Sequence, residues 1–247
     1  MRQVLWGLLV LAWTCTPARA PAYRPFDSTD AAVAAKGDLE LELGPVGFLR
    51  DGRGQLVVLP AMIFNLGIAR GWEVVLRATQ LVLADPSGGA RWRLVDTALS
   101  VKGILRAGSL QSGRGPSVAT ELGVLLPSPN DEPGPGLIGR LIVSQRWAPM
   151  TMHANGGVAY TRAGDLGLVG GVILEGPRRW AIRPVAELLG EWERNDHWLA
   201  SGLIGAIWRA TEALSVDVGL RAGRASTASV LEVRAGLTYA VALWRDL

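Results

Sequence analysis

The sequence predicts an all-β fold: a transmembrane, antiparallel, up-and-down β-barrel of about twelve strands that follows a cleaved signal peptide. Two observations predict it. From Asp38 onward, stretches of about a dozen residues alternate apolar and polar side chains and end at turns rich in Gly, Pro or Asp. The chain is also apolar, with 49% hydrophobic residues and a mean hydropathy of +0.24. Beyond the leader, however, no run of roughly 18 apolar residues could cross a bilayer as a helix.

The start of the chain is organised like an export signal. Arg2 gives a short basic beginning, residues 4–13 form an apolar run, and Ala18-Arg19-Ala20 fits a small-x-small cleavage site. The only cysteine, Cys15, is removed with this leader, so the exported chain has no disulfide to form. We expect a signal peptide over residues 1–20, an N-terminal extension or partial plug over 21–37, and an outer-membrane barrel over 38–247. The sequence leaves open whether the extension lies in the periplasm or in the lumen.

Charged residues mark one parity of most predicted strands. Residues 214–221 and 231–241 place Leu, Val and Tyr on one face and Asp, Arg, Glu, Ser and Thr on the other. Residues 95–102 are interpreted in the same way, with Val95 on the apolar face and Asp96 on the charged face, whereas residues 199–209 leave their register ambiguous. An Arg or Lys that faces lipid at mid-bilayer costs about 2–4 kcal/mol. The sorting therefore indicates that the apolar face looks at hydrocarbon and the charged face at the barrel interior.

Two sets of residues follow from this interpretation. The charged parity is expected to line the lumen, as a pore lining or as a network of interior ion pairs, and tryptophans near segment ends are expected to form girdles at the two membrane interfaces. The lumen-lining set is Arg77, Lys102, Glu121, Arg140, Arg146, Arg183, Glu187, Glu191, Asp217, Arg221, Glu232 and Arg234. The interface set is Trp72, Trp92, Trp147, Trp180, Trp192, Trp198 and Trp244.

A soluble β-sandwich would also sort its residues by parity, with the apolar face turned inward. The predicted strands of about a dozen residues are long against a soluble mode of about 5–6, and their apolar faces have few polar interruptions. Both features favour the membrane. In lipid every backbone group must be paired within the protein, so the last strand, ending near Trp244, is expected to pair with the first, near Leu39. With an even number of strands, both ends of the chain are expected on the periplasmic side of the membrane.

Patterns that would indicate catalysis or metal binding are weak. His153 and His197 have no neighbours at the spacing of metal ligands, so neither a metal nor a cofactor is expected. His153 and Asn155 share a strand face, which suggests a lipid hydrolase barrel, but no serine lies at a spacing that identifies it as the nucleophile. The glutamates within 187–193 are interpreted as lumen charges rather than as an acid–base pair. The formal charge of +3 gives no reason to expect nucleic-acid binding, and we expect no enzyme activity.

Four segments carry a family resemblance. They are RPFDSTDA at 24–31, GPVGFLR at 44–50, TELGVLLPSP at 120–129 and IVSQRW at 142–147. These segments resemble the outer-membrane transporters grouped as "MetA-pathway of phenol degradation" barrels. The resemblance implies an outer-membrane β-barrel that passes small, often hydrophobic or aromatic compounds, and it implies no catalytic residues. Such barrels commonly end in an aromatic residue that the assembly machinery recognises, whereas this chain ends in Trp244-Arg245-Asp246-Leu247.

The sequence thus predicts a passive channel or transporter for small molecules in the bacterial outer membrane. Its expected partners are outer-membrane lipids, the barrel assembly machinery and a small-molecule solute. Because a barrel of about twelve strands lies between filled small barrels and open porins, any pore is expected to be narrow. Two alternatives remain: a structural or assembly barrel with a closed, charge-paired lumen, and a barrel lipid hydrolase.

Overall fold

The computed structural model describes residues 16–17, 25–51, 54–84, 90–127, 134–194, 197–226 and 228–244. The predicted signal peptide and its cleavage site therefore lie outside the described residues, apart from residues 16–17. Parts of the turns expected near 51–54, 85–90 and 127–136 also lie outside them, as does the side chain of Trp92. No helix in the described part of the chain is long and apolar enough to cross a membrane.

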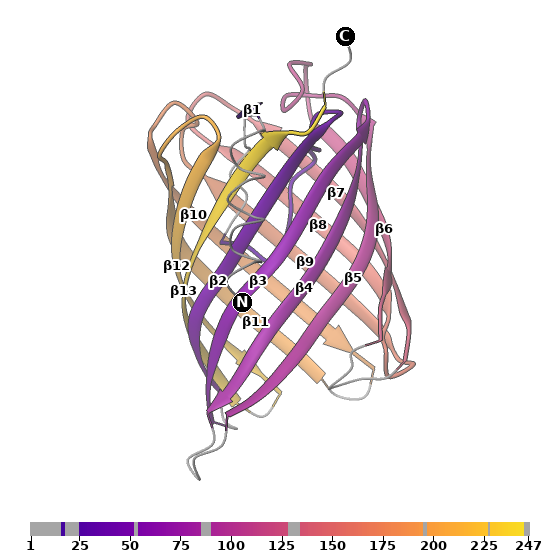
Figure 1. Ribbon diagram of the computed structural model, residues 1–247, viewed down its shortest axis with the longest axis vertical. Coiled ribbons are helices and arrows are strands. Elements are labelled where there is room, and N and C mark those ends of the chain that lie inside the picture. The colour runs from indigo at the N-terminus through magenta and orange to yellow at the C-terminus, as the bar shows by residue number, and fades with distance from the viewer. Residues whose placement is uncertain are drawn as a thin grey trace.

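Twelve of the thirteen strands found in the described residues close into an antiparallel barrel (Figure 1). Each pairs with its neighbours in chain order, and β13 pairs with β2, so the predicted closed barrel is confirmed. The remaining strand, β1 (Thr16–Pro17), is a two-residue bridge on the end of β13. The barrel strands are β2 (Asp38–Asp51), β3 (Gly54–Ala69), β4 (Trp72–Ala84), β5 (Ala90–Arg106), β6 (Ser117–Leu125), β7 (Gly136–Arg146), β8 (Thr151–Tyr160), β9 (Leu166–Glu175), β10 (Ile182–Glu193), β11 (His197–Arg209), β12 (Leu214–Ala225) and β13 (Ala228–Ala242).

The wall of the barrel sorts its side chains by parity. On β13, Glu232 and Arg234 are only 6% and 4% exposed, whereas Leu231 and Val233 are 50% and 57% exposed. A soluble sandwich would show the opposite, because its leucines and valines would be the buried set. Exposed Leu, Val and Ile side chains recur on nearly every barrel strand whose side chains are described. The fold is therefore that of an outer-membrane β-barrel, with an apolar outer surface and a charged interior.

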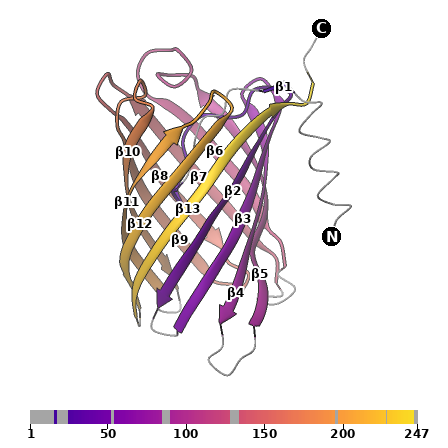
Figure 2. The ribbon, with the colours of Figure 1, turned by 60° about the vertical axis from the view of Figure 1, so that its left-hand side comes forward.

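The barrel has two rims, which we name by the chain. β2 begins and β13 ends at the terminal rim, at the top of Figure 1, and the hairpin between β10 and β11 lies at the opposite rim (Figure 2). Tryptophans lie close to both rims. Trp192 and Trp198 are exposed cross-strand neighbours at the opposite rim. Trp72, Trp147, Trp180 and Trp244 are exposed near the terminal rim, where Trp208, which was not predicted, joins them.

One strand departs from the predicted parity. Pairing of β4 with β5 shifts register between Arg77 and Thr79, so β5 carries an extra residue at this point. Asp96 adopts a left-handed backbone with φ of 53°, which Asp tolerates better than most residues. A bulge of this kind switches the side-chain alternation. Val95, predicted to face lipid, is consequently buried.

The ambiguous register of residues 199–209 has a physical cause. β11 carries apolar residues on both faces: Ile204 and Trp208 are exposed, whereas Leu203 and Ile207 are buried. The buried pair belongs to an apolar cluster inside the barrel, which also contains Phe26, Ile173 and Val185. Because Phe26 precedes the barrel in the chain, this part of the wall has an apolar partner on its inner side as well as its outer side. Alternation is therefore lost in the sequence although the strand is regular.

Candidate functional site

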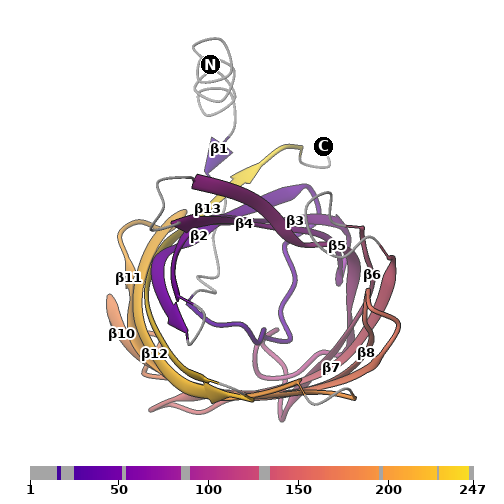
Figure 3. The ribbon, with the colours of Figure 1, turned by 90° about the horizontal axis from the view of Figure 1, so that it is seen from below.

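Residues 25–37, which we call the plug, lie inside the barrel (Figure 3). The plug crosses the lumen and reaches the terminal rim, where it turns into β2. At that turn Gly37 has φ of +84°, and a Cβ there would lie 2.1 Å from the carbonyl oxygen of Trp244. Glycine is therefore required at this junction. Of the two places that the sequence left open for this segment, the structure shows the described part in the lumen.

The first anchor of the plug is Asp27. Its carboxylate forms ion pairs with Arg221, from β12, and with Arg234, from β13, the latter at 3.0 Å. Burial alone would raise the pKa of Asp27, but the charges of Arg234 and Arg221 outweigh it and hold the pKa well below its ordinary value. The backbone N–H of Ser28 donates to Glu187 Oε1 at 2.8 Å, and Glu187 also accepts from Arg221. The plug thus adds a third carboxylate to a network in which the wall already pairs Arg221 with Glu187 and Arg234 with Glu232.

The second anchor lies across the lumen, on β4 and β5. Lys102 Nζ is 3.5 Å from Asp30 of the plug and 3.3 Å from Glu73. Glu73 in turn accepts the backbone N–H of Ala34 at 2.6 Å. Glu40 lies beside this group and is buried as well. A buried lysine is stable only when it is paired and hydrogen-bonded, and here the plug supplies part of that pairing.

The third anchor is formed by uncharged polar groups on β7 and β8. Asn155 accepts the backbone N–H of Thr29 at 3.0 Å and donates to the Thr29 carbonyl at 2.8 Å. The Ala31 N–H donates to Ser144 Oγ at 3.0 Å, and the Ala31 carbonyl accepts from Gln111 at 2.7 Å. Gln111 belongs to the connection between β5 and β6 at the terminal rim. Side chains therefore provide hydrogen-bond partners for backbone groups of the plug. A buried segment outside any strand requires this, because it has no strand neighbours to pair with.

A hydrogen-bonded series of three side chains supports the third anchor. Ser144 Oγ is 2.7 Å from His153 Nδ1, and His153 Nε2 is 3.2 Å from Glu175 Oε1. The arrangement resembles the Ser–His–acid set of hydrolases. All three side chains are buried, however, and Ser144 already accepts the Ala31 N–H. If His153 carries its proton on Nε2 and donates it to Glu175, Nδ1 can accept a hydrogen bond from the Ser144 hydroxyl. The series therefore orients Ser144 Oγ as the acceptor for the plug.

The other predicted lumen residues extend the network along the wall. Glu121 pairs with Arg140 at 3.5 Å and lies 4.0 Å from Arg77. Arg183 pairs with Glu175 at 2.9 Å. The rest are placed as follows: Glu232 pairs with Arg234, Asp217 is buried, Arg146 contacts the carbonyl of Ser109, and Glu191 lines a cavity.

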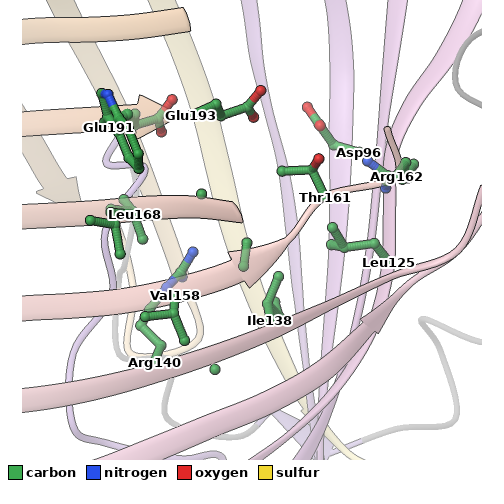
Figure 4. Close-up of a pocket in the computed structure, with 15 residues that line it drawn as sticks. Asp96, Leu125, Ile138, Arg140, Val158, Thr161, Arg162, Leu168, Glu191 and Glu193 are labelled. Atoms are coloured by element: carbon green, nitrogen blue, oxygen red, sulfur yellow. The ribbon is translucent and has the colours of Figure 1, made fainter. Parts of the chain in front are cut away.

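That cavity lies at the opposite rim and measures about 360 Å³ (Figure 4). Glu191 and Glu193 come to it from β10, Arg140 from β7 and Asp96 from β5. The inward side chains of Leu125, Ile138, Ala159 and Val169 contribute apolar surface between these charges. The lumen therefore contains two different regions, a plugged part toward the terminal rim and a hollow toward the opposite rim.

The sequence did not reveal the contacts of the plug. Its interaction with the wall joins residues more than 100 positions apart, such as Asp27 with Glu187 and Ala31 with Ser144. One signal was present: the run Phe26-Asp27-Ser28-Thr29-Asp30 is rich in polar and acidic groups that the charged interior of a barrel would bind. Among the described residues, no three His, Cys, Asp or Glu side chains converge as a metal site would require.

Comparison with solved structures places the fold among outer-membrane channels. The COG4313 outer membrane channel from Pseudomonas putida F1 matches with a TM-score of 0.57 and 10% identity, covering 88% of this chain and 99% of that one. The KdgM porin matches with a TM-score of 0.54 and 9% identity, covering 81% of this chain and 98% of that one. No family model matches the chain. No curated protein matches it either. The likeness thus shows the fold, a β-barrel like those of outer-membrane channels, and no particular family.

Proposed function

We propose that this protein is an outer-membrane channel for small molecules whose lumen is closed at rest by residues 25–37. The observation that carries the proposal is how the plug is held. Its contacts with the wall are mostly ion pairs and hydrogen bonds, from Asp27, Thr29 and Asp30, rather than a continuous apolar core. When the plug leaves, the wall presents charged and polar side chains that water can solvate. A passage for solutes needs such an interior.

The proposed class of solute is small and partly apolar. Two observations support it: the apolar side chains that line the hollow at the opposite rim, and the resemblance of four segments to barrels associated with aromatic compounds. A barrel of twelve strands holds only a narrow pore. Large oligomers are therefore excluded unless they pass in an extended form.

Liposome swelling tests the proposal directly. Liposomes that contain the purified full-length protein are expected to admit small polar solutes such as glycine slowly, and faster when Asp27→Arg releases the plug, and to exclude large oligosaccharides. Protein-free liposomes and liposomes with heat-denatured protein are the controls. The channel function is contradicted if no small solute enters with either the wild type or a variant whose plug has been released.

A structural barrel with a permanently closed lumen is the second candidate, and the ion pairs across the interior favour it. Arg140→Gln discriminates between the two, because Arg140 lines the hollow and pairs with Glu121 of the wall rather than with the plug. In a channel this change alters conductance and ion preference. In a closed barrel it only lowers the temperature at which the protein unfolds in a gel-mobility assay. A lipid hydrolase is disfavoured because the hydroxyl of Ser144 is completely buried and faces the plug.

A further inference from the structure

The hollow at the opposite rim exists because two rows of inward-facing side chains contain small residues. Cross-strand pairing aligns four strands here, β7 to β10, and each row ends on β10 in a glutamate. In the middle of the rows lie glycines and an alanine, whose small side chains leave space above the backbone. We call this part of the wall the floor of the cavity. The first row is Arg140, Gly157, Val169 and Glu191, and the second is Ile138, Ala159, Gly167 and Glu193.

The floor separates charges of opposite sign. Three strand spacings of about 4.8 Å place the Cα atoms of Arg140 and Glu191 roughly 14 Å apart across the sheet. Only apolar and glycine surface lies between them, from Gly157 and Val169 in this row and from Ala159 in the next. Figure 4 shows Arg140 and Ile138 on one side of the cavity and Glu191 and Glu193 on the other.

The basic groups of the cavity are already engaged, whereas two of its acids are not. Arg140 pairs with Glu121, and Arg162 donates to the carbonyl oxygens of Leu126 at 2.8 Å and Thr97 at 2.7 Å. Glu191 and Glu193 have no hydrogen bond or ion pair with any described residue. The cavity therefore offers two carboxylates that can accept hydrogen bonds next to an apolar floor, while Arg140 and Arg221, whose charges act on Glu191, are already paired with Glu121 and Glu187.

We propose that this cavity binds a small organic cation, with an ammonium group on Glu191 and Glu193 and an apolar body on the floor of Val169, Ala159 and Ile138. Charge-assisted hydrogen bonds to carboxylates are roughly twice as strong as neutral ones, so the carboxylates select the ammonium. The apolar floor selects the body, and the volume of about 360 Å³ limits it to a few fused or linked rings at most.

The position of the cavity in the barrel suggests that binding there precedes passage of the solute. This part of the inference rests on the proposed channel function. Bacterial barrels with an even strand number keep both chain ends on the periplasmic side. The terminal rim is then periplasmic, and the cavity lies on the external side of the plug. A solute arriving from outside meets this cavity first and the plug afterwards.

Isothermal titration calorimetry of the full-length protein in detergent at about pH 8, where free carboxylates are ionised, tests the proposal. The probes are benzylammonium, benzyl alcohol and benzoate, which share one apolar body and differ in charge. Benzylammonium is expected to bind about tenfold more tightly than benzyl alcohol, and benzoate not measurably. The double change Glu191→Gln with Glu193→Gln is expected to remove this preference.

Two further variants separate charge from shape. Ala159→Leu keeps every charge but fills the floor, and it is expected to weaken benzylammonium binding about tenfold or more. Glu212→Gln removes an exposed carboxylate near the terminal rim and is expected to change nothing. A heat-dependent gel shift verifies that each variant is folded. Equal affinities for benzylammonium and benzyl alcohol, or full binding by the double variant, would overturn the proposal.

Failure of this inference is distinguishable from failure of the channel function. Binding is measured in detergent without any membrane, whereas conduction is measured with potassium chloride and without organic ligand. Selective binding without conductance by either the wild type or the plug-released variant Asp27→Arg supports the cavity and contradicts the channel. Conductance without selective binding contradicts the cavity and leaves the channel in place.

Discussion

Asp27→Arg is expected to raise the ion conductance of the reconstituted barrel severalfold. The substitution places a third guanidinium beside Arg221 and Arg234, which now hold the Asp27 carboxylate. Breaking a fully buried ion pair costs about 3–5 kcal/mol. Because the Asp27 side chain is 37% exposed, we expect about 2–3 kcal/mol here. Each 1.4 kcal/mol is about a tenfold change in population, so the population of the state with the plug released should rise about 30- to 100-fold. Planar-bilayer recording measures the result.

The matched control for this variant is Glu212→Arg. It makes the same change of charge at an exposed position near the terminal rim, outside the lumen, and conductance should stay at the wild-type value. Phe26→Ala provides an independent route to the same state, because it removes the apolar anchor of the plug and leaves its charges intact. Truncating a buried Phe costs about 3–5 kcal/mol. If both plug variants fold and conduct like the wild type, residues 25–37 do not gate the lumen.

The barrel itself was predictable because lipid and lumen impose opposite demands on alternate residues over a whole strand. Residues 231–241 illustrate this, since each of their charges falls on the parity that the structure buries. Prediction failed where a local feature broke the alternation. The extra residue on β5 at Asp96 and the apolar inner face of β11 against Phe26 are two such features. The bulge at Asp96 leaves no mark in the sequence that differs from an ordinary polar–apolar run. β11 shows apolar residues on both faces, but its sequence does not indicate that Phe26 covers the inner one.

The internal contacts were less predictable because they join strands and segments far apart in the chain. Ser144 and His153 face each other only because the hairpin between β7 and β8 pairs Arg146 with Thr151. Sequence spacing alone did not identify Ser144, since the register of a hairpin depends on its turn. Glu175 reaches His153 from β9. For the plug, the sequence showed a polar segment but not the surface that binds it.

Leu188→Arg is expected to destabilise the barrel in a bilayer by about 2–4 kcal/mol, the cost of an arginine that faces lipid near mid-membrane. Leu188 lies near the middle of β10 and is 69% exposed on the outer surface. The same substitution at Ile182, the first residue of β10, lies at the terminal rim, where the cost falls to about 0–1 kcal/mol. Both side chains are well exposed, so a water-soluble barrel would tolerate the two changes equally. Urea unfolding in lipid vesicles measures the difference, and equal stability of the two variants would contradict the membrane-facing surface on which the channel proposal depends.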